Sequence, residues 1–71
     1  MEQAIAECAE RIMKALAEEG ESNVLRLSQQ LSERSVITYQ ALGWLAREGK
    51  ILYAQRGNQV YVSIRAGAPR A

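Results

Sequence analysis

Residues 35–64 read SVITYQALGWLAREGKILYAQRGNQVYVSI, and this stretch decides the fold. Its first half carries small and apolar side chains at the three- and four-residue spacing of one helix face. The inward stripe is predicted to consist of Thr38, Ala41, Leu42 and Leu45, with Ile37 and Trp44 at its edge. We therefore expect a helix that begins at Ser35, as its N-cap, and runs to about Glu48, with Gly49 ending it.

The second half of the stretch predicts a β-hairpin. Residues 51–55 and 59–64 are rich in β-branched and aromatic side chains, which favour strands. Between them, Arg56-Gly57-Asn58 is typical of a tight turn, because glycine and asparagine tolerate positive φ. In the second run, alternate residues share a side of the strand: Val60, Val62 and Ile64 on one, and Tyr61, Ser63 and Arg65 on the other.

Two more helices are predicted upstream. Residues 3–19 place apolar side chains along one helix face, which indicates an amphipathic helix. A shorter helix fits residues 24–33, with Ser22 or Asn23 available as its cap. Val24 fits equally well in a brief strand that pairs later in the fold, and the sequence leaves both interpretations open.

Three helices followed by a two-stranded hairpin are the layout of a winged helix-turn-helix, an α+β fold in which the hairpin is the wing. We assign residues 1–65 to this domain and expect residues 66–71 to form a disordered C-terminal tail. One shared core suits so short a chain. It is predicted to contain Ile5, Ile12, Leu16, Leu27, Leu31, Leu42, Leu45, Ile51, Val60 and Val62.

Residues 41–51, ALGWLAREGKI, form the most distinctive string in the chain. They resemble the signature of a small family of bacterial and archaeal winged helix-turn-helix domains of uncharacterised function, and the resemblance extends from about residue 4 to residue 64. It implies the same three helices and wing. Thr38 departs from the family's pattern, which usually has an aliphatic side chain early in the third helix. Because the family is defined mainly by its fold, the resemblance implies little about function.

Composition excludes several chemistries. The chain has no histidine and a single cysteine, Cys8, so it has neither an internal disulfide nor a multi-cysteine zinc site. Cys8 is expected to be a small buried apolar residue. We expect no metal, no cofactor and no enzymatic activity, because no nucleophile has an adjacent base and no loop is built to cradle a phosphate. Met1-Glu2-Gln3 lacks the order of a secretory signal and no apolar run is long enough to span a bilayer, so we expect a cytoplasmic protein without membrane contact.

Charge is distributed unevenly along the chain, although the net charge is only +1. Residues 1–23 hold six glutamates against Arg11 and Lys14, a balance of −4. Residues 24–71 hold seven cations against Glu33 and Glu48, a balance of +5. Such asymmetry between the two halves of a chain indicates contact with nucleic acid.

We therefore hypothesise a nucleic-acid-binding module that binds double-stranded DNA through the third helix and the wing; one use of such binding is transcription regulation. Gln40 is suited to pair with adenine and Val36 to contact a thymine methyl group. Arg56, at the hairpin tip, is expected to enter a minor groove or to bind phosphate. The complete set of candidate contacts is Arg26, Arg34, Ser35, Val36, Tyr39, Gln40, Arg47 and Arg56.

The alternative hypothesis is a protein-interaction module on the same frame, without DNA binding. Val36, Tyr39 and Trp44 form an apolar and aromatic surface that suits a protein interface, and the first helix is acidic. Trp44 is interpreted as a core or dimer-contact residue. A homodimer and a protein partner both remain open at this point.

Overall fold

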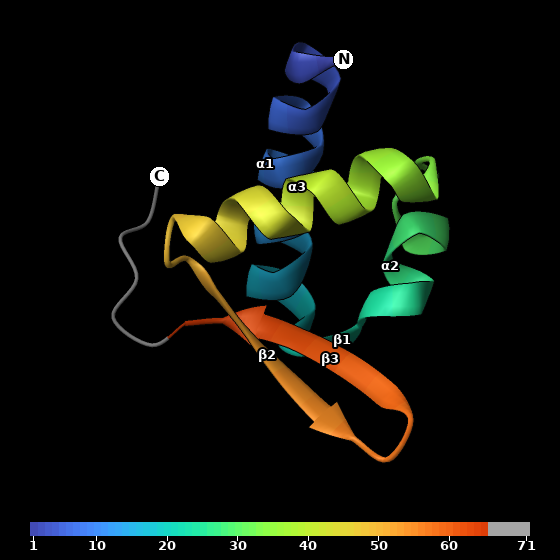
Figure 1. The fold of residues 1–71 in the computed structure, drawn as a ribbon, viewed down its shortest axis with the longest axis vertical. Coiled ribbons are helices and arrows are strands. Elements are labelled where there is room, and N and C mark those ends of the chain that lie inside the picture. Colours follow the sequence, from blue (N-terminus) through green and yellow to red (C-terminus); the bar gives the residue numbers. More distant parts are fainter. Residues whose placement is uncertain (66–71) are drawn as a thin grey trace.

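Three helices and three strands follow one another in the part of the chain that the computed structural model describes, residues 1–65. They are α1 (Glu2–Glu19), β1 (Ser22–Asn23), α2 (Val24–Gln30), α3 (Ser35–Arg47), β2 (Ile51–Arg56) and β3 (Gln59–Ile64). α1 and α3 cross each other, and the hairpin of β2 and β3 extends past the helices (Figure 1). The predicted winged helix-turn-helix is thereby confirmed. The tail predicted at residues 66–71 lies outside the described residues.

α1 is amphipathic, and one of its faces is completely buried. Cys8 and Ile12 have no exposed surface and Leu16 is 2% exposed. This face packs against α3 and β3. As predicted, Cys8 is a small buried residue, and desolvation by burial raises the pKa of its thiol. Within residues 1–65, no helix is both long and apolar enough to cross a bilayer.

The structure decides between the two interpretations of Val24 in favour of the helix. β1 consists of Ser22 and Asn23, which pair with β3, and Val24 is the first residue of α2. The helix begins there because the Asn23 side chain accepts a hydrogen bond of 2.9 Å from the backbone N–H of Leu25. Of the two predicted caps, Asn23 is therefore the one that is used.

α2 is shorter than predicted, since it ends at Gln30 and does not reach Glu33. Ser32 has a φ of +53°, a left-handed conformation that turns the chain out of the helix. Arg11 of α1 holds this turn: its guanidinium donates to the carbonyl of Leu31 and lies 3.6 Å from the Glu33 carboxylate. The link between α2 and α3 is consequently short and anchored to α1.

The N-cap of α3 is Arg34, not Ser35, which is the first helical residue. The predicted end of the helix, at about Glu48, lies one residue beyond the observed end, because the helix ends at Arg47 and Glu48 is its C-cap. Thr38 has no exposed surface, and its hydroxyl donates to the Arg34 carbonyl at 3.0 Å. The polar side chain that departs from the family's pattern is thus hydrogen-bonded inside the core, as buried polar groups must be.

The two residues predicted at the edge of the inward stripe on α3, Ile37 and Trp44, differ in burial. Ile37 is 1% exposed and belongs to the core, because α1 covers this side of α3. Trp44 is 45% exposed, which excludes a core role. Only the first turns of α1 lie beside Trp44, and they leave much of the indole uncovered.

The sheet has the strand order β1-β3-β2, and all pairs are antiparallel. Ile51 pairs with Ile64 at the helix-covered end, where Ile51 is buried. Val60 was expected in the core but is 37% exposed. It pairs with Gln55 near the turn, where the hairpin has passed beyond the helices and nothing covers the sheet (Figure 1). The turn itself contains Gly57 with a φ of +63°.

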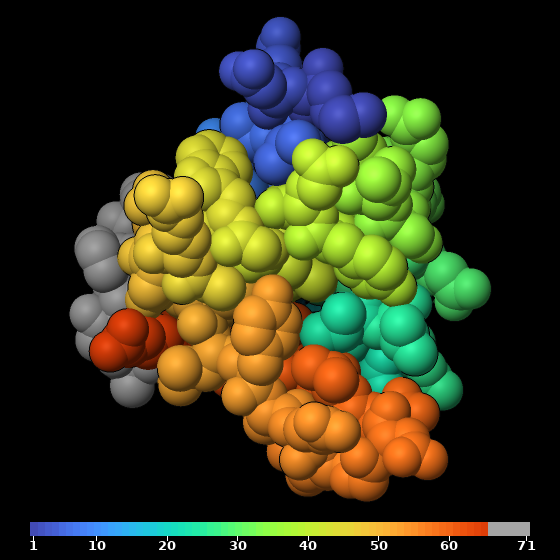
Figure 2. Space-filling view, viewed as in Figure 1, coloured from blue at the N-terminus to red at the C-terminus, as the bar shows by residue number. Residues whose placement is uncertain are grey.

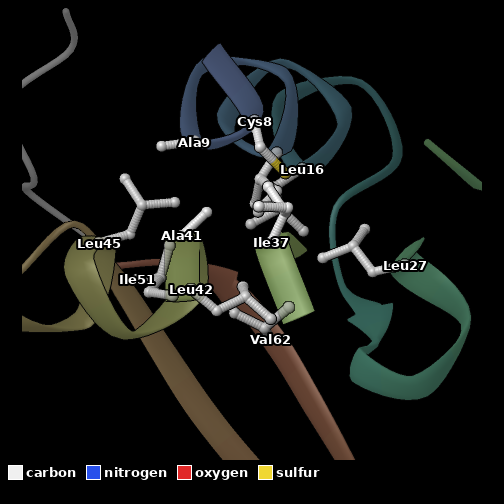
Figure 3. Packing of buried hydrophobic residues seen from close by; sticks show 11 residues of the cluster. Cys8, Ala9, Leu16, Leu27, Ile37, Ala41, Leu42, Leu45, Ile51 and Val62 are labelled. Atoms are coloured by element: carbon white, nitrogen blue, oxygen red, sulfur yellow. The ribbon is translucent and has the colours of Figure 1, made fainter. Parts of the chain in front are cut away.

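The core lies where α1, α2, α3 and the sheet meet. Figure 3 shows Leu16, Leu27, Ile37 and Val62 converging from four elements. Two predicted core residues, Ile5 and Leu31, are partly buried and pack at its margin. The other predicted members are confirmed as buried: Ile12, Leu16, Leu27, Leu42, Leu45, Ile51 and Val62.

Candidate nucleic-acid interface

The outer face of α3 is exposed, although the Gln40 side-chain amide donates to the sulfur of Met1 at 4.0 Å. The inward stripe turns the opposite side of the helix toward solvent, so Val36 and Tyr39 are 50% and 43% exposed. Gln40, Gly43 and Arg47 are exposed on the same side. Figure 2 shows this face: α3, in yellow-green, crosses it above the orange hairpin, and α1 reaches it only with its blue N-terminal turns.

Each end of α3 carries an exposed cation, Arg34 at the N-cap and Arg47 as the last helical residue. At 1.5 Å per residue these two positions are about 20 Å apart along the helix axis. No carboxylate occurs between them in the sequence of α3. The outer face of this helix therefore ends at Arg47 and otherwise has neutral side chains, while Arg34 precedes the first turn on the side of the buried Thr38.

Arg34 occupies a position that helix stability does not explain. The N-terminal end of a helix carries partial positive charge, so a cation is unfavourable there. Arg34 also makes no capping hydrogen bond through its side chain. Its backbone N–H instead donates to the Glu33 carboxylate at 2.8 Å. The Glu33 carboxylate therefore already lies beside this end of α3.

Several carboxylates near the motif are engaged by other residues or point elsewhere, but the exposed Glu48 directly follows Arg47 as the C-cap of α3. Glu33 lies beside Arg11, and Glu21 forms an ion pair with Arg56. On α1, the buried stripe faces α3, so the exposed Glu7 lies on the opposite side of that helix. Glu10 and Glu18 share this outward side. The fold thus separates an acidic face of α1 from the neutral and basic face of α3.

Arg56 is the predicted contact that the structure does not bring to this face. It pairs with Gln59 across the hairpin and lies over the ring of Tyr61 at 4.2 Å, on the sheet face opposite Val62. There its guanidinium binds the Glu21 carboxylate. This hydrogen-bonded pair lowers the pKa of Glu21 and raises that of Arg56. The hairpin tip therefore does not add a free cation to the face of α3.

The remaining predicted contacts are divided between α2 and the start of α3. The Ser35 hydroxyl lies 3.4 Å from that of Ser28, so it links the two helices of the motif. Arg26 lies on α2 and lines an open polar cleft with Asn23 and Tyr61. Arg26 is thus offset from the α3 face, toward β1 and β3.

Tyr53 is a candidate that the sequence analysis missed. It pairs with Val62, so it points to the helix-facing side of the sheet, yet it is 47% exposed. Partial burial raises the pKa of its hydroxyl by desolvation. The available signal was the alternation from the buried Ile51, which places Tyr53 on the side of the wing that faces α3.

Comparison with known proteins agrees with the fold. A family described as a winged helix-turn-helix domain (DUF2582) matches residues 1–64. The chain belongs to this winged helix-turn-helix family. The membership confirms the resemblance carried by residues 41–51. No curated protein matches this chain.

A solved structure shares the architecture of this winged helix-turn-helix domain. The Zalpha domain from Carassius auratus PKZ, determined in complex with Z-DNA, has a TM-score of 0.74 and 16% sequence identity. The match covers 87% of this chain and 98% of the Zalpha chain. At this identity the likeness establishes the fold.

Within residues 1–65, no group of three or more His, Cys, Asp or Glu side chains is arranged to hold a metal ion.

Proposed function

We propose that this chain is a nucleic-acid-binding module that places α3 in the major groove of double-stranded DNA. One observation carries the proposal: α3 has an exposed cation at each end, Arg34 and Arg47, and no carboxylate between them. Phosphate groups on either side of a groove are the partners that such a spacing of cations fits. The DNA-bound Zalpha domain supports the proposal, since its fold is the same.

The other side chains of this face have roles that follow from their positions. Val36 and Gln40 lie in the N-terminal half of α3, the part of a recognition helix that reaches base edges. Gln40 pairs with adenine, and Val36 packs on a thymine methyl group. Tyr39 and Ser35 bond phosphate oxygens beside them, and Arg26 extends the contact along α2.

From the wing, Tyr53 contributes to the proposed contact with DNA. Its ring lies on the side of β2 that faces α3, where its hydroxyl reaches a phosphate of the same strand of DNA. Arg56 contributes only when Glu21 releases it. Regulation of transcription is the use we propose for such binding.

The test is a salt titration of binding to a fluorescently labelled duplex, followed by anisotropy. If phosphates are neutralised by Arg34 and Arg47 of α3 and by Arg26 of α2, log K falls with log salt with a slope of about −3. Replacing Arg34 and Arg47 together by alanine should reduce the magnitude of that slope by about 2. A left-handed alternating guanine–cytosine duplex, used as a second ligand, measures the preference for duplex form.

Lys14→Ala is the control, because it removes one positive charge, half the charge lost in the double variant, from the outer face of α1. Its affinity and slope should equal those of the wild-type chain. Equal losses in Lys14→Ala and in the arginine variants would mean that net charge acts without a defined site. Absence of duplex binding at low salt would refute the proposal.

A second candidate function, protein interaction, is favoured by the surroundings of Trp44. Its half-exposed indole lies in a shallow groove with Ile5 and Ala6 of α1, lined also by Glu2 and Gln3. Large exposed apolar groups of this kind are enriched at protein interfaces. This function predicts little duplex binding and a mass in sedimentation velocity that rises with protein concentration. Trp44→Ala should abolish that rise.

A further inference from the structure

Gly43 is an exposed glycine in the interior of α3. It lies on the outer face of α3, four residues after Tyr39 and four before Arg47. Glycine is among the least favourable residues for a helix interior, because it loses the most backbone freedom on folding. A reason for its presence is therefore to be sought in its contacts.

The fold itself does not require a glycine at this position. A Cβ built on Gly43 meets no atom within 4 Å. Its φ is not positive, in contrast to Gly20, Gly49 and Gly57. Alanine would consequently fit without strain and would favour the helix. Neither packing nor backbone conformation within residues 1–65 accounts for the missing side chain.

The neighbours of Gly43 make its surface a notch. Residues three and four apart lie next to each other on a helix, so the exposed side chains of Tyr39 and Gln40 stand on one side. Arg47 stands on the other side, one turn further along. Between them the helix backbone is bare. A group that approached Gly43 would have Arg47 one turn away on the same side of the helix, whereas the Gln40 amide donates to the Met1 sulfur.

We propose that Gly43 is the position at which the sugar-phosphate backbone of DNA contacts α3, with the phosphate held by Arg47. This inference rests on the proposed function and identifies the residue that sets how closely the helix approaches the duplex. A methyl group at position 43 would hold the phosphate away from the helix and lengthen its contact with the Arg47 guanidinium. Gly43 is thus a positioning residue, and its absent side chain favours binding at the expense of the helix.

Gly43→Ala separates these two effects, because they have opposite signs. Thermal unfolding should show a Tm about 5 °C higher, as expected when alanine replaces glycine in a small helical domain. Duplex affinity at low salt should fall by about tenfold, and Gly43→Leu should lose more. The control is Ala17→Gly on the exposed face of α1. That variant makes the reverse change of one methyl group, and it should lower Tm without changing affinity.

A double-mutant cycle tests the shared phosphate. In an Arg47→Ala background, Gly43→Ala should lower affinity by no more than about twofold, since the contact it disturbs is already lost. A tenfold loss in both backgrounds would overturn the pairing of Gly43 with Arg47. A wild-type chain that binds duplex as tightly as Gly43→Ala does would overturn this inference alone. A wild-type chain that binds no duplex would overturn the proposed function, and the inference with it.

Discussion

Arginines of the same charge have different partners in this domain, and some of them are bound to a glutamate. Arg11 and Arg56 belong to the same residue type as Arg34 and Arg47, but each is paired with a glutamate of the fold. Guanidinium groups that already bind a carboxylate are poorly available to phosphate. Whether an arginine is available for the proposed contact therefore depends on its nearest carboxylate.

Replacing Glu21 by glutamine should raise duplex affinity several-fold, because it frees Arg56 from its ion pair. Anisotropy at low salt measures the change. Glu18→Gln removes the same charge from the outer side of α1 and serves as the control. If both variants gain affinity equally, release of Arg56 is not the cause.

The Glu21 carboxyl should titrate below its ordinary value of 4.5, because Arg56 stabilises the charged form only in the folded chain. The pair therefore contributes stability above that value, and the contribution is lost as pH falls through the lowered pKa. Carboxyl chemical shifts measured by NMR follow the titration directly. Arg56→Ala should move the midpoint upward, and an unchanged midpoint would contradict the pairing.

At the scale of elements, short contacts at the ends of helices shape the motif. Asn23 both caps α2 and donates from its amide to the Gln59 side chain at 2.7 Å. It therefore connects the start of α2 to the wing. Ser32 and Arg11 shape the other end of α2, so both ends of this seven-residue helix are anchored.

Replacing Asn23 by alanine should lower the free energy of unfolding by about 1 kcal/mol, the usual cost of losing an N-cap. Urea unfolding measures the loss. Asn23→Asp keeps the accepting oxygen but loses the donor to Gln59. The stability of this variant should therefore lie between that of the wild-type chain and that of Asn23→Ala. Asn58→Ala, in the exposed hairpin turn, makes the same substitution outside a helix cap. An equal loss in that variant would argue against a capping role.

At the scale of the whole molecule, one core supports every surface discussed above. The same buried side chains join α1, α2, α3 and the sheet, so the face of α3 exists only when all four are packed together. The fold also places the acidic side of α1 away from α3. The acidic side of α1 would therefore repel an anionic duplex, in keeping with the contact proposed for the other side of the domain.

Replacing Ile12 by alanine should destabilise the domain by about 2–5 kcal/mol, because this fully buried side chain would leave a cavity in the only core. Domains of this size have little stability to spare, so circular dichroism should show a large unfolded fraction at 37 °C. Leu25→Ala, at a position that is 61% exposed, should change stability by less than about 0.5 kcal/mol. Comparable losses in the two variants would mean that Ile12 is not in the core.

The sequence by itself determined the three helices, the hairpin and most of the core. Those features depend on spacing along the chain, on caps such as Asn23 and on turn residues such as Gly57, which are all local. Only the tertiary structure decided that Ser22 and Asn23 add a third strand, and that Val60 and Trp44 are exposed. It also decided which side of the sheet holds Arg56. Each of these depends on segments far apart in the sequence, and pairing and burial between such segments arise only when the whole chain packs.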